Sequence, residues 1–331
     1  MTTQLSQEIA SKIISAKEAD HARQDAAADT VAAVLDGWYV AMVKVSTQRV
    51  GLTQSIDRIY QAFAQRLYTV FLDEMSGLAA KSQAEAAAAI IAALPDKAKT
   101  ALISTLPSGA VELGIEGDLT EAVNPPPLPS ASPLPYLEMP KVDLTKLAKL
   151  TRKQIDAIMK RVVFAPMTRK QVQAILFQAQ AVNRIAPITS LVTPQRLISV
   201  VSQAASKGLS RAQIARQVLE PIFQTTKSDA KRVARTTGAL IANQSNMQAF
   251  QGLGDLLAGY QVHCVTDKNS RPWHQARKNQ VYKINPKEGE KGLKQMPRPP
   301  YEPEDPAERP DGTPEIAHNC RCFLSPVCRK L

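Results

Sequence analysis

Histidine and cysteine residues gather near the C-terminal end of the chain in an order that suits metal binding. His318, Cys320 and Cys322 are spaced two residues apart, so an extended segment projects all three side chains from one face. Such an edge supplies three ligands, whereas a tetrahedral zinc site needs four. His274 lies upstream and is the first candidate for the fourth ligand. The spacing therefore predicts a zinc site formed by these four residues.

Two alternatives to zinc stay open at this point. If zinc is bound, His263 and Cys264 are substitutes for the fourth ligand. Without metal, the histidines and cysteines also fit a buried cluster that is held by hydrogen bonds. A disulfide is the third possibility. Because neighbouring thiols in Cys-x-Cys make a strained ring, a disulfide would involve Cys264 or Cys328.

A row of basic residues forms the second candidate site. Lys227, Lys231 and Arg235 recur at every fourth position of an expected helix, with Arg232 beside them, opposite its apolar face. The block 141–260 contains eighteen basic and five acidic residues, so the excess charge of +11 lies here. Such a row can bind the phosphates of double-stranded DNA without reading its sequence. The alternatives are a solvated face or a surface complementary to an acidic protein partner.

The motifs of common enzyme classes are absent from the sequence. It contains no nucleophile elbow, phosphate-binding loop or His-Glu-x-x-His helix. A zinc ion closed by four protein ligands has no position left for water. We therefore expect no enzymatic activity and no catalytic or cofactor-binding residues. The alternative is a metal-dependent nucleic-acid-processing enzyme, in which Asp267, His274 and His318 leave one metal position open.

Long helices are expected in residues 1–123, where alanine is abundant. Apolar residues recur at helical spacing from Gly51 to Met75, and a further helix covers 84–93 and ends before Pro95. The longest apolar run, nine residues, is too short to span a membrane. This segment is acidic, so we expect it to pack against other helices or to dock on a protein neighbour. A self-contained helical bundle without a partner is the alternative.

A proline-rich segment, 124–140, separates the acidic helices from the basic block. Its seven prolines exclude a helix or a central strand and favour a stiff polyproline spacer. The sequence therefore predicts a domain boundary here.

Shorter helices are expected in residues 141–260. Ser210 with Gln213 predicts a capping box that opens a helix closed by Pro221. Thr226, with Asp229, predicts a weaker cap that opens the longest helix of this block.

A small module with strands is expected in residues 261–331. Apolar and β-branched residues predict strands near 262–265, 281–284 and 320–324. The predicted fold class is mainly α: an N-terminal helical domain, a proline-rich linker, a helical middle domain and a small C-terminal α+β module.

The C-terminal cluster also resembles a known family. His318-Asn319-Cys320-Arg321-Cys322 is similar to the closing signature of phage head morphogenesis proteins of the Mu F-like minor head type. A helical segment from Val233 to Ser245 resembles an earlier element of that family, and the resemblance covers about residues 190 to 326. The upstream half of the signature is matched by Thr266, Asp267, Arg271 and His274.

The resemblance implies a structural role in assembly of the phage head. It implies a low-copy virion component near the portal vertex, with portal and capsid proteins as partners and packaged DNA as a further contact. Cysteines confined to one end do not make a disulfide framework, so we expect folding in the host cytoplasm. An internal DNA-binding protein that is ejected with the genome is the alternative.

Overall fold

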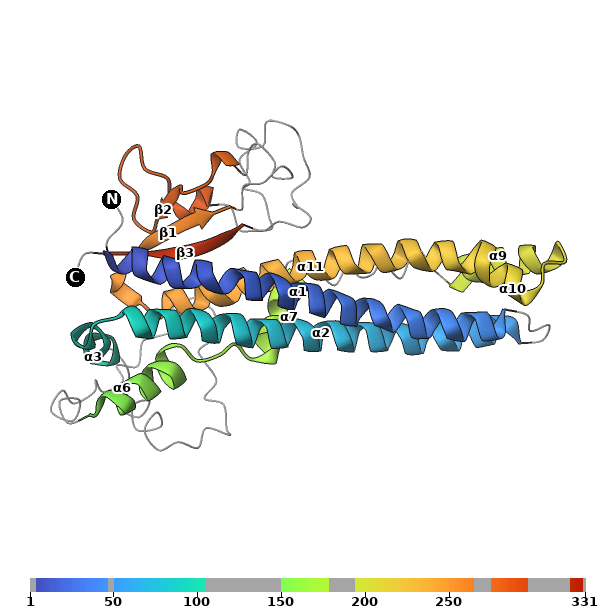
Figure 1. Cartoon of the computed structure of the whole chain (residues 1–331), viewed down its shortest axis with the longest axis horizontal. Helices are drawn as coiled ribbons and strands as arrows, with labels where there is room; N and C mark the ends of the chain where they lie inside the picture. Colours follow the sequence, from blue (N-terminus) through green and yellow to red (C-terminus); the bar gives the residue numbers. More distant parts are fainter. Residues whose placement is uncertain are drawn as a thin grey trace, which may run out of the picture.

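Helices dominate the architecture, and one small antiparallel sheet lies near the C-terminal end of the chain (Figure 1). The computed structural model describes residues 4–46, 51–104, 150–178, 194–264, 275–296 and 322–329. This arrangement confirms the predicted fold class, mainly α with a small C-terminal α+β module.

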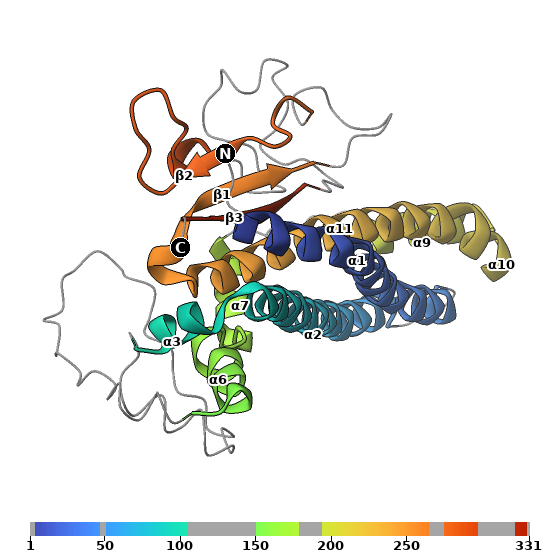
Figure 2. The ribbon, with the colours of Figure 1, turned by 60° about the vertical axis from the view of Figure 1, so that its left-hand side comes forward.

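Three long helices run side by side and give the molecule its elongated shape (Figures 1 and 2). They are α1 (Gln4–Val45), α2 (Leu52–Ala93) and α11 (Glu220–Gln251). α1 runs antiparallel to the other two, and each of the three packs against both others. At a rise of 1.5 Å per residue, α1 and α2 each extend over about 63 Å.

An aromatic cluster joins the three helices in the bundle core. The ring of Trp38 on α1 stacks on Phe63 of α2, with centroids 3.9 Å apart and an angle of 11° between planes. Phe223 of α11 meets Trp38 edge to face at 5.0 Å. Large aromatic side chains bury much apolar area, so this contact stabilises the three-helix core directly.

A partly buried charged network sets the position of α1 on α2. The Arg23 guanidinium donates two hydrogen bonds to the carboxylate of Glu85, at 2.7 and 2.6 Å. Asp20 is 3% exposed, contacts Arg23, and accepts a hydrogen bond from the Ser82 hydroxyl at 3.0 Å. Such bidentate pairing is geometrically specific, so a shift of one helix along the other would leave the buried Asp20 carboxylate without its partners.

α1 is long and apolar enough to span a membrane. It is the one helix with this property in the described part of the chain. Its buried side, which includes Leu35, Trp38 and Met42, packs in the core of the bundle. Buried core helices satisfy the same length and composition test.

α2 unites two predicted helices. The segments predicted at 51–75 and 84–93 form one continuous helix, because the polar residues between them do not break it: the Ser76 hydroxyl bonds to the Leu72 carbonyl at 2.7 Å. The end of this helix before Pro95 is confirmed.

Shorter helices pack around the bundle, and they come from the sequence before and after the proline-rich segment. The proline-rich segment itself lies outside the described residues. α7 and α9 pack against α2. The bounds of these helices are α3 (Asp96–Ser104), α6 (Arg152–Ile158) with a π-helical continuation η1 (Met159–Val163), α7 (Arg169–Gln178), α9 (Pro194–Ser206), and α10 (Arg211–Ile214) with a π-helical continuation η2 (Ala215–Leu219).

Two buried side chains fasten the segments after the proline-rich region to the N-terminal helices. Lys99 of α3 is 2% exposed and donates to the Asp156 carboxylate of α6 at 2.8 Å. The side chain of Gln83 on α2 donates to the Ala165 carbonyl at 2.7 Å and accepts from the Met167 amide at 2.6 Å. Elements predicted to belong to different domains therefore share contacts in the described structure.

Two predicted helix ends in the middle block are wrong. The capping box of Ser210 and Gln213 is confirmed, but the helix continues through η2 directly into α11. Pro221 lies where the π-helical turn η2 is followed by α11, and the proline does not end the helix there. Thr226 lies inside α11 instead of capping it, and its hydroxyl donates to the Ile222 carbonyl at 2.7 Å.

The sheet contains three antiparallel strands in the order β2-β1-β3. They are β1 (Leu257–His263), β2 (Val281–Lys283) and β3 (Phe323–Cys328), and short 3-10 turns lie at Gly254–Leu256 and Leu293–Gln295. The three predicted strands are confirmed with shifted bounds. β3 contacts both α1 and α11, so the sheet lies on one end of the bundle (Figure 1).

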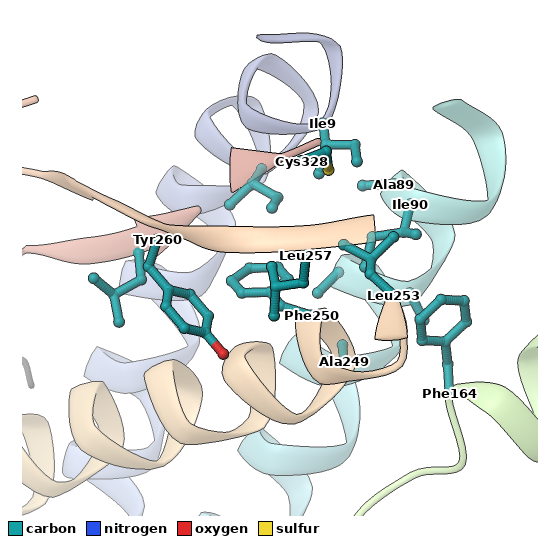
Figure 3. Packing of buried hydrophobic residues seen from close by; sticks show 14 of the residues in the cluster. Ile9, Ala89, Ile90, Phe164, Ala249, Phe250, Leu253, Leu257, Tyr260 and Cys328 are labelled. Carbon is teal, nitrogen blue, oxygen red and sulfur yellow. The ribbon is translucent and has the colours of Figure 1, made fainter. Parts of the chain in front are cut away.

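A second apolar core fills the junction between the sheet and the helices (Figure 3). Phe250 and Leu253 at the end of α11 meet Leu257 and Tyr260 of β1 there. Residues distant in sequence complete it: Ile9 of α1, Ile90 of α2 and Cys328 of β3. The backbone amide of Cys328 also donates to the Ser6 hydroxyl at 2.8 Å.

Substitution of Gly259 in β1 tests the tight pairing of the sheet. A Cβ atom at this position would lie 2.2 Å from the Tyr282 carbonyl oxygen of β2. Because the obstacle is backbone, we expect Gly259→Ala to lower the free energy of unfolding by about 1–3 kcal/mol in urea titrations followed by circular dichroism.

Gly77→Ala is the matched control for this substitution. A Cβ atom at Gly77, on the exposed side of α2, would meet no atom within 4 Å. Alanine favours helix over glycine by about 1 kcal/mol, so this variant should be as stable as the wild type or more so. Equal stability of the two variants would contradict the close approach of β1 and β2.

Candidate functional site

Two buried cysteines face each other where β1 ends and β3 begins. Cys264 follows β1 and Cys322 precedes β3, and the register of His263 with Phe323 continues to this pair. Their Sγ atoms are 2.7 Å apart, and each residue is 7% exposed. The two ends of the connection 265–321 therefore meet at one thiol pair.

Asn243 of α11 holds the same point from the helix side. Its buried amide Nδ2 donates to the Cys322 carbonyl at 3.2 Å and to the Ala239 carbonyl at 2.9 Å. Asn243 belongs to the helical segment of the family resemblance, and Cys322 belongs to the closing signature. The hydrogen bond thus joins two motifs that lie 79 residues apart in sequence.

Two acceptor oxygens beside this contact have no hydrogen-bond partner in the described structure. They are Oδ1 of Asn243 and Oδ1 of Asn246, and both are buried. A spacing of three residues places them on one face of α11. Buried acceptors without a partner carry a desolvation cost of about 1–3 kcal/mol, so this face of α11 is suited to receiving further donors.

His263 belongs to the opposite face of the sheet. Neighbouring strand residues alternate between faces, so His263 points away from the side occupied by Cys264. Its Nε2 lies 2.7 Å from the Ser325 hydroxyl, and its ring stacks on Phe323 at 5.0 Å. Burial lowers the pKa of His263, which favours the neutral imidazole. Of the two substitute ligands, only Cys264 lies beside Cys322.

The predicted zinc set is described at one position only. His274, His318 and Cys320 lie outside the described residues, as does Asp267 of the nuclease alternative, whereas Cys322 lies against Cys264. The described residues contain no group of three or more potential metal ligands. Zinc binding by these four residues stays a prediction.

The predicted basic row meets a matching acidic row on α1. Lys227 pairs with Asp36 at 2.8 Å, and Lys231 pairs with Asp29 at 2.6 Å. The next pair joins Arg235 to Asp25 at 2.6 Å. Because the two helices run antiparallel, the order of the partners reverses along α1.

Arg232 completes the predicted nucleic-acid set but pairs within its own helix. Its guanidinium lies 2.9 Å from the Asp229 carboxylate, one turn earlier on α11. All four predicted basic residues therefore have an acidic partner. A DNA phosphate would have to compete with these carboxylates, so DNA contact through this row stays a prediction.

Sequence reasoning missed the acidic partners, although a signal for them was present. Asp25, Asp29 and Asp36 are spaced by four and seven residues, which places them on one face of a helix. The hydrogen bond from Lys231 is the main cause that lowers the pKa of Asp29. The basic row therefore faces an acidic row of the same chain, and a separate acidic protein partner stays a prediction.

The fold and these contacts define an elongated helical protein whose small C-terminal sheet is joined to the bundle through buried structural contacts. Residues 195–325 match the family model described as Phage Mu protein F like protein. This part of the chain is therefore similar to Mu F-like phage head morphogenesis proteins, which supports the resemblance found in the sequence motifs. Searches of curated proteins and of solved structures found no match.

Replacement of Asn243 tests the contact between the two family motifs. Asn243→Ala leaves the buried Cys322 carbonyl without its amide donor, so we expect a loss of about 1–3 kcal/mol in the free energy of unfolding. Hydrogen exchange of the β3 amides should rise in the same variant. Gln244→Ala, at the neighbouring half-buried position, is the control, and equal losses in both variants would contradict a specific role for Asn243.

Charge exchange tests the ion pairs between α1 and α11. Lys231→Glu places two carboxylates together, so we expect a lower melting temperature, with a smaller difference at high salt. The exchanged pair Asp29→Lys with Lys231→Glu should recover most of the loss. If the double variant is no more stable than Lys231→Glu alone, the two residues do not interact in solution.

Proposed function

We propose that the protein is a structural minor head protein of a bacteriophage, which acts in capsid assembly at the portal vertex. The observation that carries this proposal is the joining of the Mu F-like module to the long bundle through buried contacts. Asn243 bonds to the Cys322 carbonyl, and the Cys328 amide bonds to Ser6 of α1. A module held from two helices is suited to fixing a rigid bundle within an assembly.

The shape of the bundle supports a bridging role between neighbouring proteins. The sheet lies at one end, while the end of α1 and the start of α2, with α9 and α10, form the other end (Figure 1). The basic row is paired with the acidic row internally, so these charges stabilise the rod. We infer that the two ends contact different partners, the portal protein and the capsid shell.

The reactive side chains among the described residues make structural contacts, which supports a non-enzymatic role. His263 contacts Ser325, and Cys264 contacts Cys322. The enzyme alternative depends on Asp267, His274 and His318, which lie outside the described residues. A divalent-metal-dependent cleavage assay on single- and double-stranded DNA separates the two functions, and metal-dependent cleavage would overturn the structural proposal.

Depletion of the protein during phage assembly tests the proposed function. We expect purified wild-type heads to contain a few copies of the chain, located by gold labelling at a single vertex. Depleted particles should fail to form infectious heads, and the wild-type gene supplied in trans should restore them. Normal heads that lack the chain would overturn the proposal.

The variants described above refine this experiment. Asn243→Ala, supplied in trans, should enter heads less efficiently than Gln244→Ala, because only the first loosens the module from the bundle. Equal incorporation of both variants would show that the joint is not needed for assembly.

A further inference from the structure

The thiol pair of Cys264 and Cys322 has the backbone geometry of a cross-strand disulfide. The Val262 amide donates to the Gln280 carbonyl at 3.0 Å, and the Val262 carbonyl accepts from Asn279 at 2.8 Å, so both groups point away from β3. This direction alternates along a strand, so the backbone groups of Cys264 also point away from β3. Cys264 and Cys322 therefore form a cross-strand pair that is not joined by backbone hydrogen bonds. Such pairs have Cα atoms about 4.5 Å apart, within the range of disulfides.

The two sulfur atoms are in direct contact. Two thiolates on one tetrahedral zinc, with bonds of 2.3 Å, lie about 3.8 Å apart. The Sγ atoms of Cys264 and Cys322 are 2.7 Å apart. A bond between the two sulfurs therefore needs only a small movement of the side chains.

Cys328 differs from this pair in position and surroundings. It ends β3, six residues beyond Cys322, and packs with Ile9 and Leu257 in the junction core (Figure 3). Burial raises the pKa of its thiol to about 11, which disfavours the reactive thiolate. Cys328 thus offers a natural internal control.

We propose that Cys264 and Cys322 are a redox site that closes the connection 265–321 by a reversible disulfide. The oxidant is a low-molecular-weight disulfide such as oxidised glutathione. One protein thiolate attacks it, forms a mixed disulfide and releases one glutathione thiolate; the second protein thiolate then displaces the other glutathione. The two protein thiols lose two electrons and two protons, and one protein disulfide and two glutathione thiols result.

The location of the bond gives it a defined effect. The Cys322 carbonyl is already held by Asn243, so the disulfide would fasten the end of β1 to the same point of α11. The pair is reduced during folding in the host cytoplasm and oxidised in the released virion, where the surroundings are oxidising. This change between compartments rests on the proposed function. Oxidation would also withdraw Cys322 from the predicted zinc set.

Thiol mapping of the purified full-length chain tests the site itself. After equilibration with glutathione at increasing ratios of oxidised to reduced form, we expect two thiols to resist alkylation and the mass to fall by about 2 Da. Peptide mapping should find a bond between Cys264 and Cys322. The bond should be lost in Cys264→Ser and Cys322→Ser and retained in Cys328→Ser and Cys320→Ser.

Three outcomes would overturn the redox site. The first is continued alkylation of Cys264 and Cys322 after oxidation, and the second is a bond between Cys264 and Cys320 instead. The third is stoichiometric zinc that is lost in both Cys264→Ser and Cys322→Ser.

The oxidised wild type should melt at a higher temperature than the reduced form, and Cys322→Ser should show no such difference, which separates bond formation from general misfolding.

Rapid thiol trapping in infected cells and in purified virions tests the change between compartments. We expect the reduced pair in cells and the disulfide in virions, and a reduced pair in virions would overturn the compartment change. Absence of the chain from virions would instead contradict the proposed function. The purified-protein measurement is independent of that result, so the two failures are distinguishable.

Discussion

The hydrogen bond from Asn243 to the Cys322 carbonyl is the contact on which the arrangement of the C-terminal module depends. It joins the C-terminal half of the long helix α11 to the start of the last strand. Cys322 in turn meets Cys264 at the end of β1, so one buried point fixes three segments. Because buried carbonyls without donors are costly, the sheet can take few other positions on the helix. The contact thus joins the helical motif to the cysteine signature in this chain.

Charge pairing plays the corresponding role along the bundle. Lys227, Lys231 and Arg235 find three carboxylates on α1 in reverse order. Each exposed pair contributes little alone, but the row specifies direction and register because a shifted helix would meet like charges. The partly buried network of Arg23 acts similarly between α1 and α2. Apolar burial supplies the driving force, and the charges select one alignment.

Periodicity predicted the helices and strands well because both depend on local spacing. The capping box at Ser210 and the end of α2 before Pro95 were local signals of this kind. The errors at Pro221 and Thr226 came from residues that the continuous helix tolerates, Thr226 through a bond to a preceding carbonyl. The sequence predicted Cys322 as a site residue, but its contacts with Cys264 and Asn243 depend on strand register and helix packing. These contacts join distant segments, and spacing within one segment does not encode them.

The bond between the Cys328 amide and the Ser6 hydroxyl has a consequence for the order of folding during synthesis. Its two partners are separated by 322 residues, so α1 leaves the ribosome long before the strand that covers it exists. Contacts of such large separation form late and slow the final step. Until translation reaches β3, the apolar end of α1 near Ile9 is not covered by the strand. Chaperones that bind exposed apolar helices can bind this end during that interval.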